Sequence, residues 1–238
     1  NVLDACAARG GKTTHLLSLL HPESLVVANE VIASRAPILV ENAIRWGYSN
    51  LVITRGDAGL FKRLENIFDV IVCDAPCSGE GLFRKDAGAI SEWSLQNVEY
   101  CSLRQQRIVN DLWDSLKPGG YFIYSTCTSN LTENETNVQQ FIKKHHAECI
   151  KLNVKDFSGV EEFQRQDAVM YRFFPHKTGT EIFSLAVLRK PDVGNANSER
   201  VLPKNLKLAD KVQTDLVKKH IARGEDMFCF IHDNHIRF

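Results

Sequence analysis

The chain has 238 residues, of which 44% are hydrophobic, 24% are charged and 9% are aromatic. This is enough for one large or two small globular domains with a substantial core. Its 29 basic residues balance 29 acidic ones, so the net charge does not attract the whole protein to nucleic acid or membrane, and an anionic partner must bind a local patch. The most apolar stretches, 68–73 and 182–188, are far shorter than the roughly 20 residues of a membrane-spanning helix, so no membrane span is predicted.

Short apolar runs typical of buried strands alternate with helical patterns over the first 190 residues, which predicts an α/β fold with a mostly parallel sheet. The five predicted strands are 2–6, 25–30, 51–54, 68–73 and 121–126. Apolar spacing predicts helices around 36–44, ending at Gly47, around 108–116 before a turn at 117–120, and around 132–142. Thr132 and Glu135 form a possible capping box for the last of these helices.

Two further apolar runs, 169–174 and 182–188, predict an antiparallel hairpin that closes the edge of the sheet. The expected sheet therefore has seven strands, five in the parallel part and two in the hairpin. We expect this domain to cover residues 1–190.

A polar stretch at 191–197 reads as a linker to a small accessory unit, 191–238, of which only the start is expected here. Residues 200–223 hold seven Lys or Arg against two acidic residues, which fits either a solvated helix or a patch that faces nucleic acid. A strand-like run at 227–231 has no predicted partner. We expect the natural protein to extend beyond both ends of this sequence.

The first strand leads into a glycine turn, Cys6-Ala7-Ala8-Arg9-Gly10-Gly11-Lys12, before a helical run. Glycines at a strand-to-helix turn let backbone N–H groups approach a ligand at the positive end of the helix. A P-loop nucleotidase is disfavoured, because the first glycine of that motif would fall on Cys6. A tight turn without a ligand is the structural alternative.

Acidic residues follow the next two predicted strands. Glu30 lies about 20 residues after the glycines, where an α/β sheet places a carboxylate that accepts hydrogen bonds from ribose hydroxyls. Asp57 follows the third strand. Either residue alone could be a helix cap or a solvated loop residue, but together with the glycine turn they predict a nucleoside ligand.

Cys77 and Cys127 follow the fourth and fifth predicted strands and are surrounded by polar residues and glycines. If these strands are neighbours, both thiols share one crevice at the carboxyl ends of the strands. A thiolate that adds to carbon 6 of a pyrimidine converts carbon 5 into a nucleophile that can accept a methyl group. Lys12, Arg84 or Lys85 could raise the thiolate fraction.

The remaining cysteines are expected to be small buried hydrophobic residues. They are Cys6, Cys73, Cys101, Cys149 and Cys229. Free thiols in a long chain favour a reducing compartment, and we expect the protein in the cytoplasm. No Cys-x-x-Cys pair occurs, so no metal site is predicted.

Four motifs occur in the order seen in the Nop/Sun family of RNA cytosine-5 methyltransferases, and the resemblance covers about residues 2–190. The motifs are Leu3-Asp4-Ala5-Cys6-Ala7-Ala8-Arg9-Gly10-Gly11-Lys12-Thr13, Asp74-Ala75-Pro76-Cys77-Ser78-Gly79-Glu80-Gly81, Tyr124-Ser125-Thr126-Cys127-Thr128 and Glu133-Asn134-Glu135. With the run Arg84-Lys85-Asp86, the chain is most similar to the family's bacterial ribosomal RNA methyltransferase F subgroup. The resemblance implies a Rossmann-like methyltransferase fold, S-adenosylmethionine as cofactor, and methylation of cytosine in structured RNA.

The resemblance also implies roles for particular residues. Cys127 would attack the base, Cys77 would assist release of the product, and Asp74 would lie between cofactor and base. The residues implied to hold the cofactor are Cys6, Ala7, Ala8, Arg9, Gly10, Gly11, Lys12, Glu30, Arg35, Asp57, Asp74 and Pro76. Arg84, Lys85 and His176 are candidates for RNA contacts, although His176 could equally be an ordinary loop or core histidine.

Arg9 departs from the family, which usually has proline at this position, and the change either loosens the turn or lies outward. The predicted function is therefore methylation of carbon 5 of cytosine in RNA, with ribosomal RNA as the expected substrate, by a monomer that binds neither metal nor membrane. Two alternatives stay open. Transfer RNA could be the substrate, or the chain could be a non-catalytic RNA-binding module on the same fold.

Overall fold

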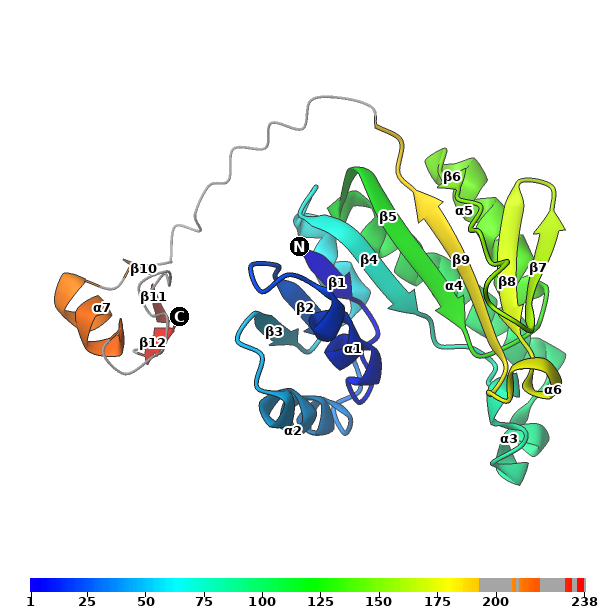
Figure 1. The fold of residues 1–238 in the computed structure, drawn as a ribbon, viewed down its shortest axis with the longest axis horizontal. Helices are drawn as coiled ribbons and strands as arrows, with labels where there is room; N and C mark the ends of the chain where they lie inside the picture. Colours follow the sequence, from blue (N-terminus) through cyan, green and yellow to red (C-terminus); the bar gives the residue numbers. More distant parts are fainter. Residues whose placement is uncertain (193–206, 209, 219–229, 233–234, 238) are drawn as a thin grey trace. The chain divides into compact units, whose positions relative to one another are not determined.

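The five predicted parallel strands are confirmed, and they form one half of the main sheet (Figure 1). They are β1 (Val2–Asp4), β2 (Val26–Asn29), β3 (Leu51–Thr54), β4 (Phe68–Asp74) and β5 (Leu116–Thr126). This computed structural model describes residues 1–192, 207–208, 210–218, 230–232 and 235–237. The chain divides into two compact units, Asn1–Ala196 and Asn197–Phe238, and each is described by itself.

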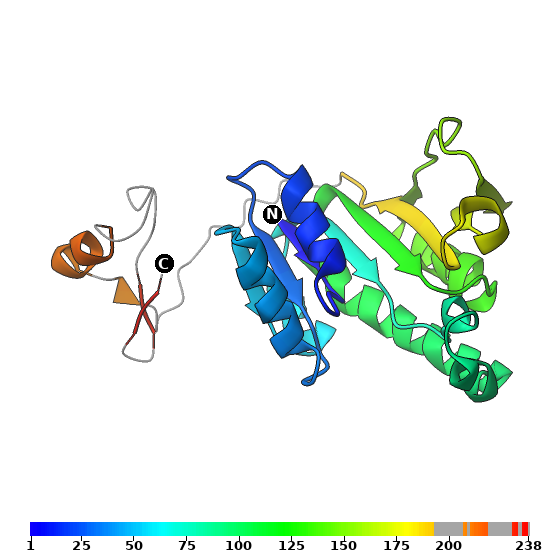
Figure 2. The same cartoon turned by 60° about the horizontal axis from the view of Figure 1, so that its bottom comes forward.

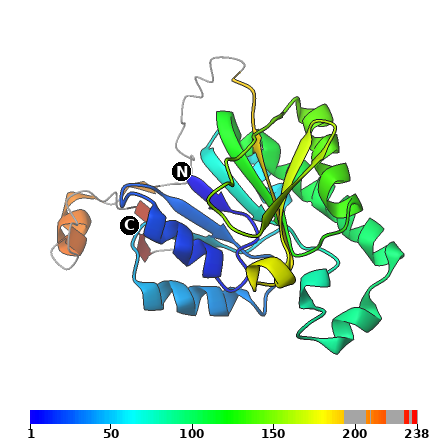
Figure 3. The ribbon, with the colours of Figure 1, turned by 45° about the vertical axis from the view of Figure 1, so that its right-hand side comes forward.

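The order of strands along the main sheet is β3-β2-β1-β4-β5-β9-β8-β7, so β3 and β7 lie at opposite edges (Figure 3). The predicted hairpin is confirmed as β8 (Ala168–Phe173) and β9 (Phe183–Arg189), and β9 runs antiparallel to β5. The sheet has nine strands rather than the expected seven. The additional strands are β6 (Glu148–Cys149), which has only two residues, and β7 (Val160–Arg165), whose mostly polar sequence gives no apolar run.

The segment 117–120 is not a turn before the fifth strand, as predicted, but part of β5. The pairing of β4 with β5 shifts register between Phe68 and Val70, so the first residues of β5 form a bulge. Gly119 has a φ of 72°, in the left-handed region that glycine adopts easily. A Pro-Gly-Gly sequence therefore marks an irregular strand here instead of a chain reversal.

Helices cover both faces of the sheet. The short helix α1 (Gly11–Leu19) and helix α2 (Ala36–Trp46) lie on the same face of the sheet (Figure 2). On this face, Leu17 of α1 packs against Val2 and Val26, and Leu39 of α2 packs against Ala28. As predicted, α2 ends at Gly47, which is left-handed with a φ of 72°.

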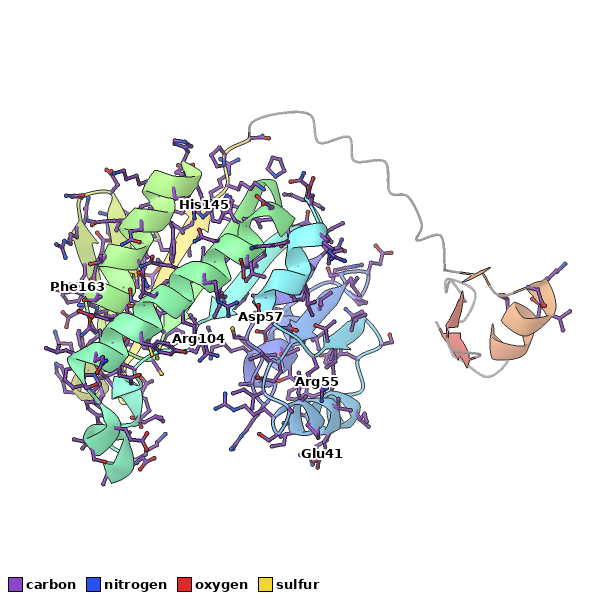
Figure 4. The ribbon with its side chains drawn as sticks, turned by 180° about the vertical axis from the view of Figure 1, so that it is seen from behind. Glu41, Arg55, Asp57, Arg104, His145 and Phe163 are labelled. Carbon is purple, nitrogen blue, oxygen red and sulfur yellow. The ribbon has the colours of Figure 1, made fainter. Side chains whose placement is uncertain are left out.

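The opposite face carries the larger core. It is covered by α4 (Leu95–Leu112), by α5 (Asn137–His145) and by the 3-10 helix η1 (Ala58–Arg63) (Figure 4). The predicted helix at 108–116 is the carboxyl-terminal part of α4 with the 3-10 turn η3 (Trp113–Ser115). The shorter elements are η2 (Glu80–Leu82), α3 (Ala87–Glu92), α6 (Pro175–Thr178) and the π-helical turn η4 (Thr132–Thr136).

The predicted capping box is wrong. Glu135 does not reach back to the start of the turn but forms a buried ion pair with Arg172 of β8, with Oε1 2.6 Å from the guanidinium. The N–H of Thr132 donates instead to the Asn130 side chain at 2.8 Å. The buried charge partner, which lies 37 residues away in sequence, decides the direction of the Glu135 side chain.

The second unit contains a three-stranded antiparallel sheet, β10 (Lys207–Leu208), β11 (Phe230–His232) and β12 (His235–Arg237), and helix α7 (Lys211–Lys218). The strand expected to lack a partner pairs on both sides, since β11 lies between β10 and β12. Parts of the predicted regions, namely 193–197, 200–206, 219–223 and 227–229 with Cys229, lie outside the described residues. Among the described residues, no helix is long and apolar enough to cross a membrane.

Candidate active site

The glycine turn between β1 and α1 forms the first wall of the site. Gly10 has a φ of 91°, and a Cβ atom there would lie 2.8 Å from a methyl group of Leu39, so only glycine fits. Asn42 donates to the carbonyl oxygen of Arg9 at 2.7 Å, and the Arg9 side chain is exposed. The arginine that replaces the family's proline therefore lies outward and does not line the pocket.

A pocket of about 290 Å³ opens beside this turn, at the carboxyl ends of the parallel strands. The predicted site residues that line it are Cys6, Ala8, Glu30, Arg35, Asp74, Pro76, Cys77 and Cys127. Cys6 is half-buried, packs against the core and also lines this wall, so a contact with the cofactor stays a prediction for it. Ala7 is buried in the core, and Gly10, Gly11 and Lys12 shape the turn without lining the pocket.

Asp74, at the end of β4, links the glycine turn to the strand β5 that leads to Cys127. Its Oδ2 lies 2.6 Å from Nζ of Lys12, and its Oδ1 accepts a hydrogen bond from Ser125 at 3.0 Å. Glu30 is buried at the end of β2 and accepts from the N–H of Ile32 at 2.6 Å. Both carboxylates are thus held on the pocket wall by neighbours in the fold.

Asp57 lies in a smaller adjoining pocket of about 30 Å³. Its two carboxylate oxygens each accept from Arg107 of α4 at 2.9 Å, and Oδ1 also accepts from the N–H of Gly59 at 3.0 Å. The Arg107 guanidinium lowers the pKa of Asp57 below its ordinary value. Sequence patterns missed Arg107 and also Arg104, which lines both pockets, because α4 gives no ligand motif.

The sulfur atoms of Cys77 and Cys127 lie 2.8 Å apart on the wall of the larger pocket. They meet because β4 and β5 are parallel neighbours in which Asp74 pairs with Ser125, so both chains leave the sheet at the same level. The N–H of Ala75 continues this pairing by donating to the Ser125 carbonyl oxygen at 2.8 Å. Six cysteines within the described residues are free thiols, these two among them.

The loops that carry the two cysteines are tied together directly. Gly81 donates from its N–H to the Cys127 carbonyl oxygen at 2.8 Å, and Glu80 accepts from both the N–H and the hydroxyl of Ser129 at 2.9 and 2.8 Å. A Cβ atom on Gly81 would lie 3.0 Å from that carbonyl oxygen and 2.9 Å from the carbonyl oxygen of Ile182. The Glu-Gly pair thus lets one loop close over the other.

The two thiols are not equivalent. The hydrogen bond between them and burial raise the pKa of Cys77 well above its usual value, while the hydrogen bond from Cys77 lowers the pKa of Cys127. When the pair loses one proton, the negative charge is therefore favoured on the Cys127 sulfur, with the Cys77 thiol as donor. This arrangement suits Cys127 as the attacking group.

The three residues predicted to contact RNA lie apart from the pocket wall. Arg84 and Lys85 are exposed and face Glu181, with the Lys85 Nζ 3.2 Å from its carboxylate. His176 is exposed on α6, with its ring centroid 5.7 Å from that of Phe174. A role in RNA binding stays a prediction for all three. No group of three or more His, Cys, Asp or Glu in the described part of the chain could hold a metal ion.

Comparison with known proteins adds the family. A model described as 16S rRNA methyltransferase RsmB/F matches residues 1–189. The chain belongs to this family. The predicted resemblance to RNA cytosine-5 methyltransferases is therefore confirmed.

Two curated relatives show the range of substrates among similar proteins. The ribosomal RNA small subunit methyltransferase F of Erwinia tasmaniensis is 38% identical over 192 residues, which are 79% of this chain and 40% of that protein. The tRNA (cytosine(49)-C(5))-methyltransferase of Pyrococcus abyssi is 38% identical over 197 residues, which are 80% of this chain and 63% of that protein. The chain thus spans less than two thirds of the length of either relative.

Among solved structures, NSun6 from Pyrococcus horikoshii, crystallised with SFG, an analogue of S-adenosylmethionine, is similar to this chain. The TM-score is 0.69 and the sequence identity 31%, over 79% of this chain and 47% of that chain. This match is consistent with a Rossmann-like methyltransferase fold for the first unit.

Proposed function

We propose that this protein transfers a methyl group from S-adenosylmethionine to carbon 5 of cytosine in RNA. The observation that carries the proposal is the contact between the Cys77 and Cys127 sulfur atoms on the wall of the pocket that Glu30 and Asp74 also line. Membership of the RsmB/F family supports the same reaction. A binding module without catalysis would not need two thiols in contact beside these carboxylates.

The pocket fits the cofactor by the chemistry of its walls. Glu30 can accept hydrogen bonds from ribose hydroxyls, and the smaller pocket with Asp57 offers an acceptor toward an adenine amine. From the turn between β1 and α1, Cys6 and Ala8 line the pocket and would lie beside the cofactor. When bound, S-adenosylmethionine would supply the electrophilic methyl group.

The chain's own residues perform the remaining steps. The Cys127 thiolate adds to carbon 6 of cytosine, and the electron pair of the carbon 5–carbon 6 double bond moves so that carbon 5 can take up the methyl group. Carbon 5 then loses its proton to a base, the double bond re-forms, and the carbon–sulfur bond breaks to return the Cys127 thiolate. Cys77, in contact with that sulfur, would assist this release.

The proposed substrate is ribosomal RNA, because the relatives named methyltransferase F share up to 38% identity with this chain. Transfer RNA is the second candidate, supported by the equally similar relative from Pyrococcus abyssi. A target cytosine inside a helix would have to be extruded into the pocket, at about a few kcal/mol. Arg84, Lys85, His176 and the basic segment at 200–223 are proposed RNA contacts, whose contribution would weaken with salt.

Single-cysteine variants test the reaction. With labelled S-adenosylmethionine and transcripts of ribosomal or transfer RNA, Cys127→Ala should give no methyl transfer and no covalent adduct. Cys77→Ala should methylate the RNA once and remain bound to it as an adduct that survives denaturing electrophoresis. Cys101→Ala removes a buried cysteine of α4 that does not line the pocket, and it should behave as the wild type.

Full turnover by Cys127→Ala, or an adduct formed through Cys77, would contradict the assignment. Bisulfite sequencing of cellular RNA with and without the intact gene would identify the modified cytosine. It would also decide between ribosomal and transfer RNA.

A further inference from the structure

A cluster of four fully buried polar side chains lies behind the loop that carries Cys77. We call it the Glu133 cluster, and its members come from α4, β5, η4 and α5. They are Gln105, Tyr124, Glu133 and Asn137, each 0% exposed. Burying polar groups is unfavourable unless every hydrogen bond is made, so such a cluster needs an explanation beyond filling the core.

The cluster holds the backbone on both sides of Cys77. Gln105 donates from Nε2 to the carbonyl oxygen of Pro76 at 2.9 Å, and Glu133 accepts at Oε2 from the N–H of Ser78 at 3.0 Å. No hydrogen bond from the cluster to Cys127 is seen within the described residues. The cluster therefore makes its direct hydrogen bonds to the loop that carries Cys77.

The members of the cluster fix one another. The second Nε2 hydrogen of Gln105 is directed to Oε2 of Glu133 at 2.7 Å, and its Oε1 accepts from Asn137 at 2.8 Å. Tyr124 donates its hydroxyl to the Glu133 carbonyl oxygen at 2.6 Å. The Gln105 amide thus has both hydrogens and its oxygen engaged, which leaves it one orientation.

We propose that Gln105 and Glu133 are positioning residues for Cys77. Gln105 keeps the Cys77 thiol against the Cys127 sulfur, so that Cys77 remains the donor and Cys127 the charged partner. Glu133 holds the other side of the Cys77 loop through the Ser78 N–H and places its carboxylate near both sulfur atoms. Neither residue lines the pocket, so both act through Cys77 rather than on the substrate. This inference rests on the proposed function for the meaning of the arrangement, although the arrangement itself can be tested without RNA.

The charges around the two thiols favour this role. The hydrogen bond between the thiols and burial are the largest influences on the pKa of both Cys77 and Cys127. The negative charge of Glu133 is a smaller influence that acts to raise the pKa of both, and Asp74 at the end of β4 acts in the same direction on Cys127. The other charged groups on the same pocket are Glu30, Arg35 and Arg104. Glu133 is the carboxylate that acts on both sulfur atoms while bonded to the Cys77 loop.

Two variants separate position from charge. Glu133→Gln keeps an oxygen that can accept from Ser78 and Gln105 but removes the charge. Gln105→Met keeps the charge and a similar side-chain shape but removes the donor to Pro76. Ser102→Ala is the matched control, because Ser102 is a buried α4 residue that donates to Asn137 at 2.8 Å and does not contact the Cys77 loop.

The readout is the rate of iodoacetamide alkylation of each cysteine against pH, measured by mass spectrometry of the separated peptides without RNA or cofactor. Glu133→Gln should move both profiles to lower pH and preserve the difference between them. Gln105→Met should reduce that difference, with the Cys127 profile moving up and the Cys77 profile moving down. Ser102→Ala should move neither.

Unchanged profiles in Glu133→Gln would overturn the inference, and so would an unchanged difference in a folded Gln105→Met protein. If Gln105→Met does not fold, Glu133→Gln decides alone, since its hydrogen bonds persist. Adduct formation by Cys77→Ala tests the proposed function separately. Shifted profiles without that adduct refute the reaction but not the positioning, and an adduct with unshifted profiles refutes only the positioning.

Discussion

Replacing Asp4 by asparagine tests the energetics of a buried carboxylate beneath the glycine turn. Asp4 is 0% exposed, accepts a hydrogen bond from Thr13 at 2.6 Å on Oδ2, and has no partner on Oδ1. Burial raises the pKa of Asp4 from 3.8 to about 6, against the opposing effects of Thr13 and Lys12. Two pKa units correspond to about 3 kcal/mol of folding free energy.

The sign of the effect follows from the raised pKa. The folded state holds the proton more tightly than the unfolded state, so the contribution of Asp4 is most favourable below pH 3.8 and is lost as the pH rises through about 6. An asparagine at this position does not titrate and can still accept from Thr13. The wild type should therefore lose about 3 kcal/mol relative to Asp4→Asn between about pH 4 and pH 8.

The assay is urea unfolding of both proteins at a series of pH values across this range. Any cost of the asparagine amide to stability is independent of pH. The test is therefore how the difference in unfolding free energy between the wild type and Asp4→Asn changes with pH, and not the size of that difference at one pH. Asp57→Asn is a control of opposite sign, because the hydrogen bond from Arg107 is the largest of the effects that lower the pKa of Asp57. A difference between the wild type and Asp4→Asn that stays constant with pH would refute the reasoning.

Two further substitutions test the packing around the site. Gly81→Ala should destabilise the fold by about 1–3 kcal/mol, because the new methyl group would press on the Cys127 backbone, and thermal unfolding would measure this loss. The same variant should reduce methyl transfer more than cofactor binding, and calorimetric titration with S-adenosylmethionine would measure the binding. Glu135→Ala should cost about 3–5 kcal/mol, since it leaves the buried guanidinium of Arg172 without its partner, and a loss below about 1 kcal/mol in urea unfolding would contradict this account.

The parallel half of the fold was predictable because buried parallel strands read as continuous apolar runs. The runs at 68–73 and 121–126 also predicted that Cys77 and Cys127 would meet if their strands were neighbours, and β4 and β5 are neighbours. Position along a strand is enough for this inference, since the carboxyl ends of parallel strands lie at one edge of the sheet. No knowledge of side-chain packing was required.

The parts that could not be predicted depend on contacts between distant residues. Gln105 is polar and lies in the middle of a helix, so no apolar pattern marks it as buried. In the structure both hydrogens of its amide nitrogen and its amide oxygen have hydrogen-bond partners. Glu135 fitted a local capping pattern but pairs with Arg172 instead. A buried charge gains more from a fixed guanidinium than from a backbone N–H at a helix start, so the tertiary contact prevails over the local motif.

The order of strands explains why the two halves of the proposed reaction meet at Asp74. From β1 the chain adds β2 and β3 toward one edge of the sheet, and from β4 it adds β5 toward the other. An open α/β sheet binds ligands at the point between β1 and β4 where this order changes direction. Glu30 and Asp57 lie beyond β2 and β3 on one side, and the two cysteines lie beyond β4 and β5 on the other. Asp74 contacts Lys12 of the first side and Ser125 of the second, at 2.6 and 3.0 Å. In the proposed reaction, a methyl group passing from a ligand held by β1–β3 to a base held by Cys127 would therefore pass next to this carboxylate, at the carboxyl edge of the sheet.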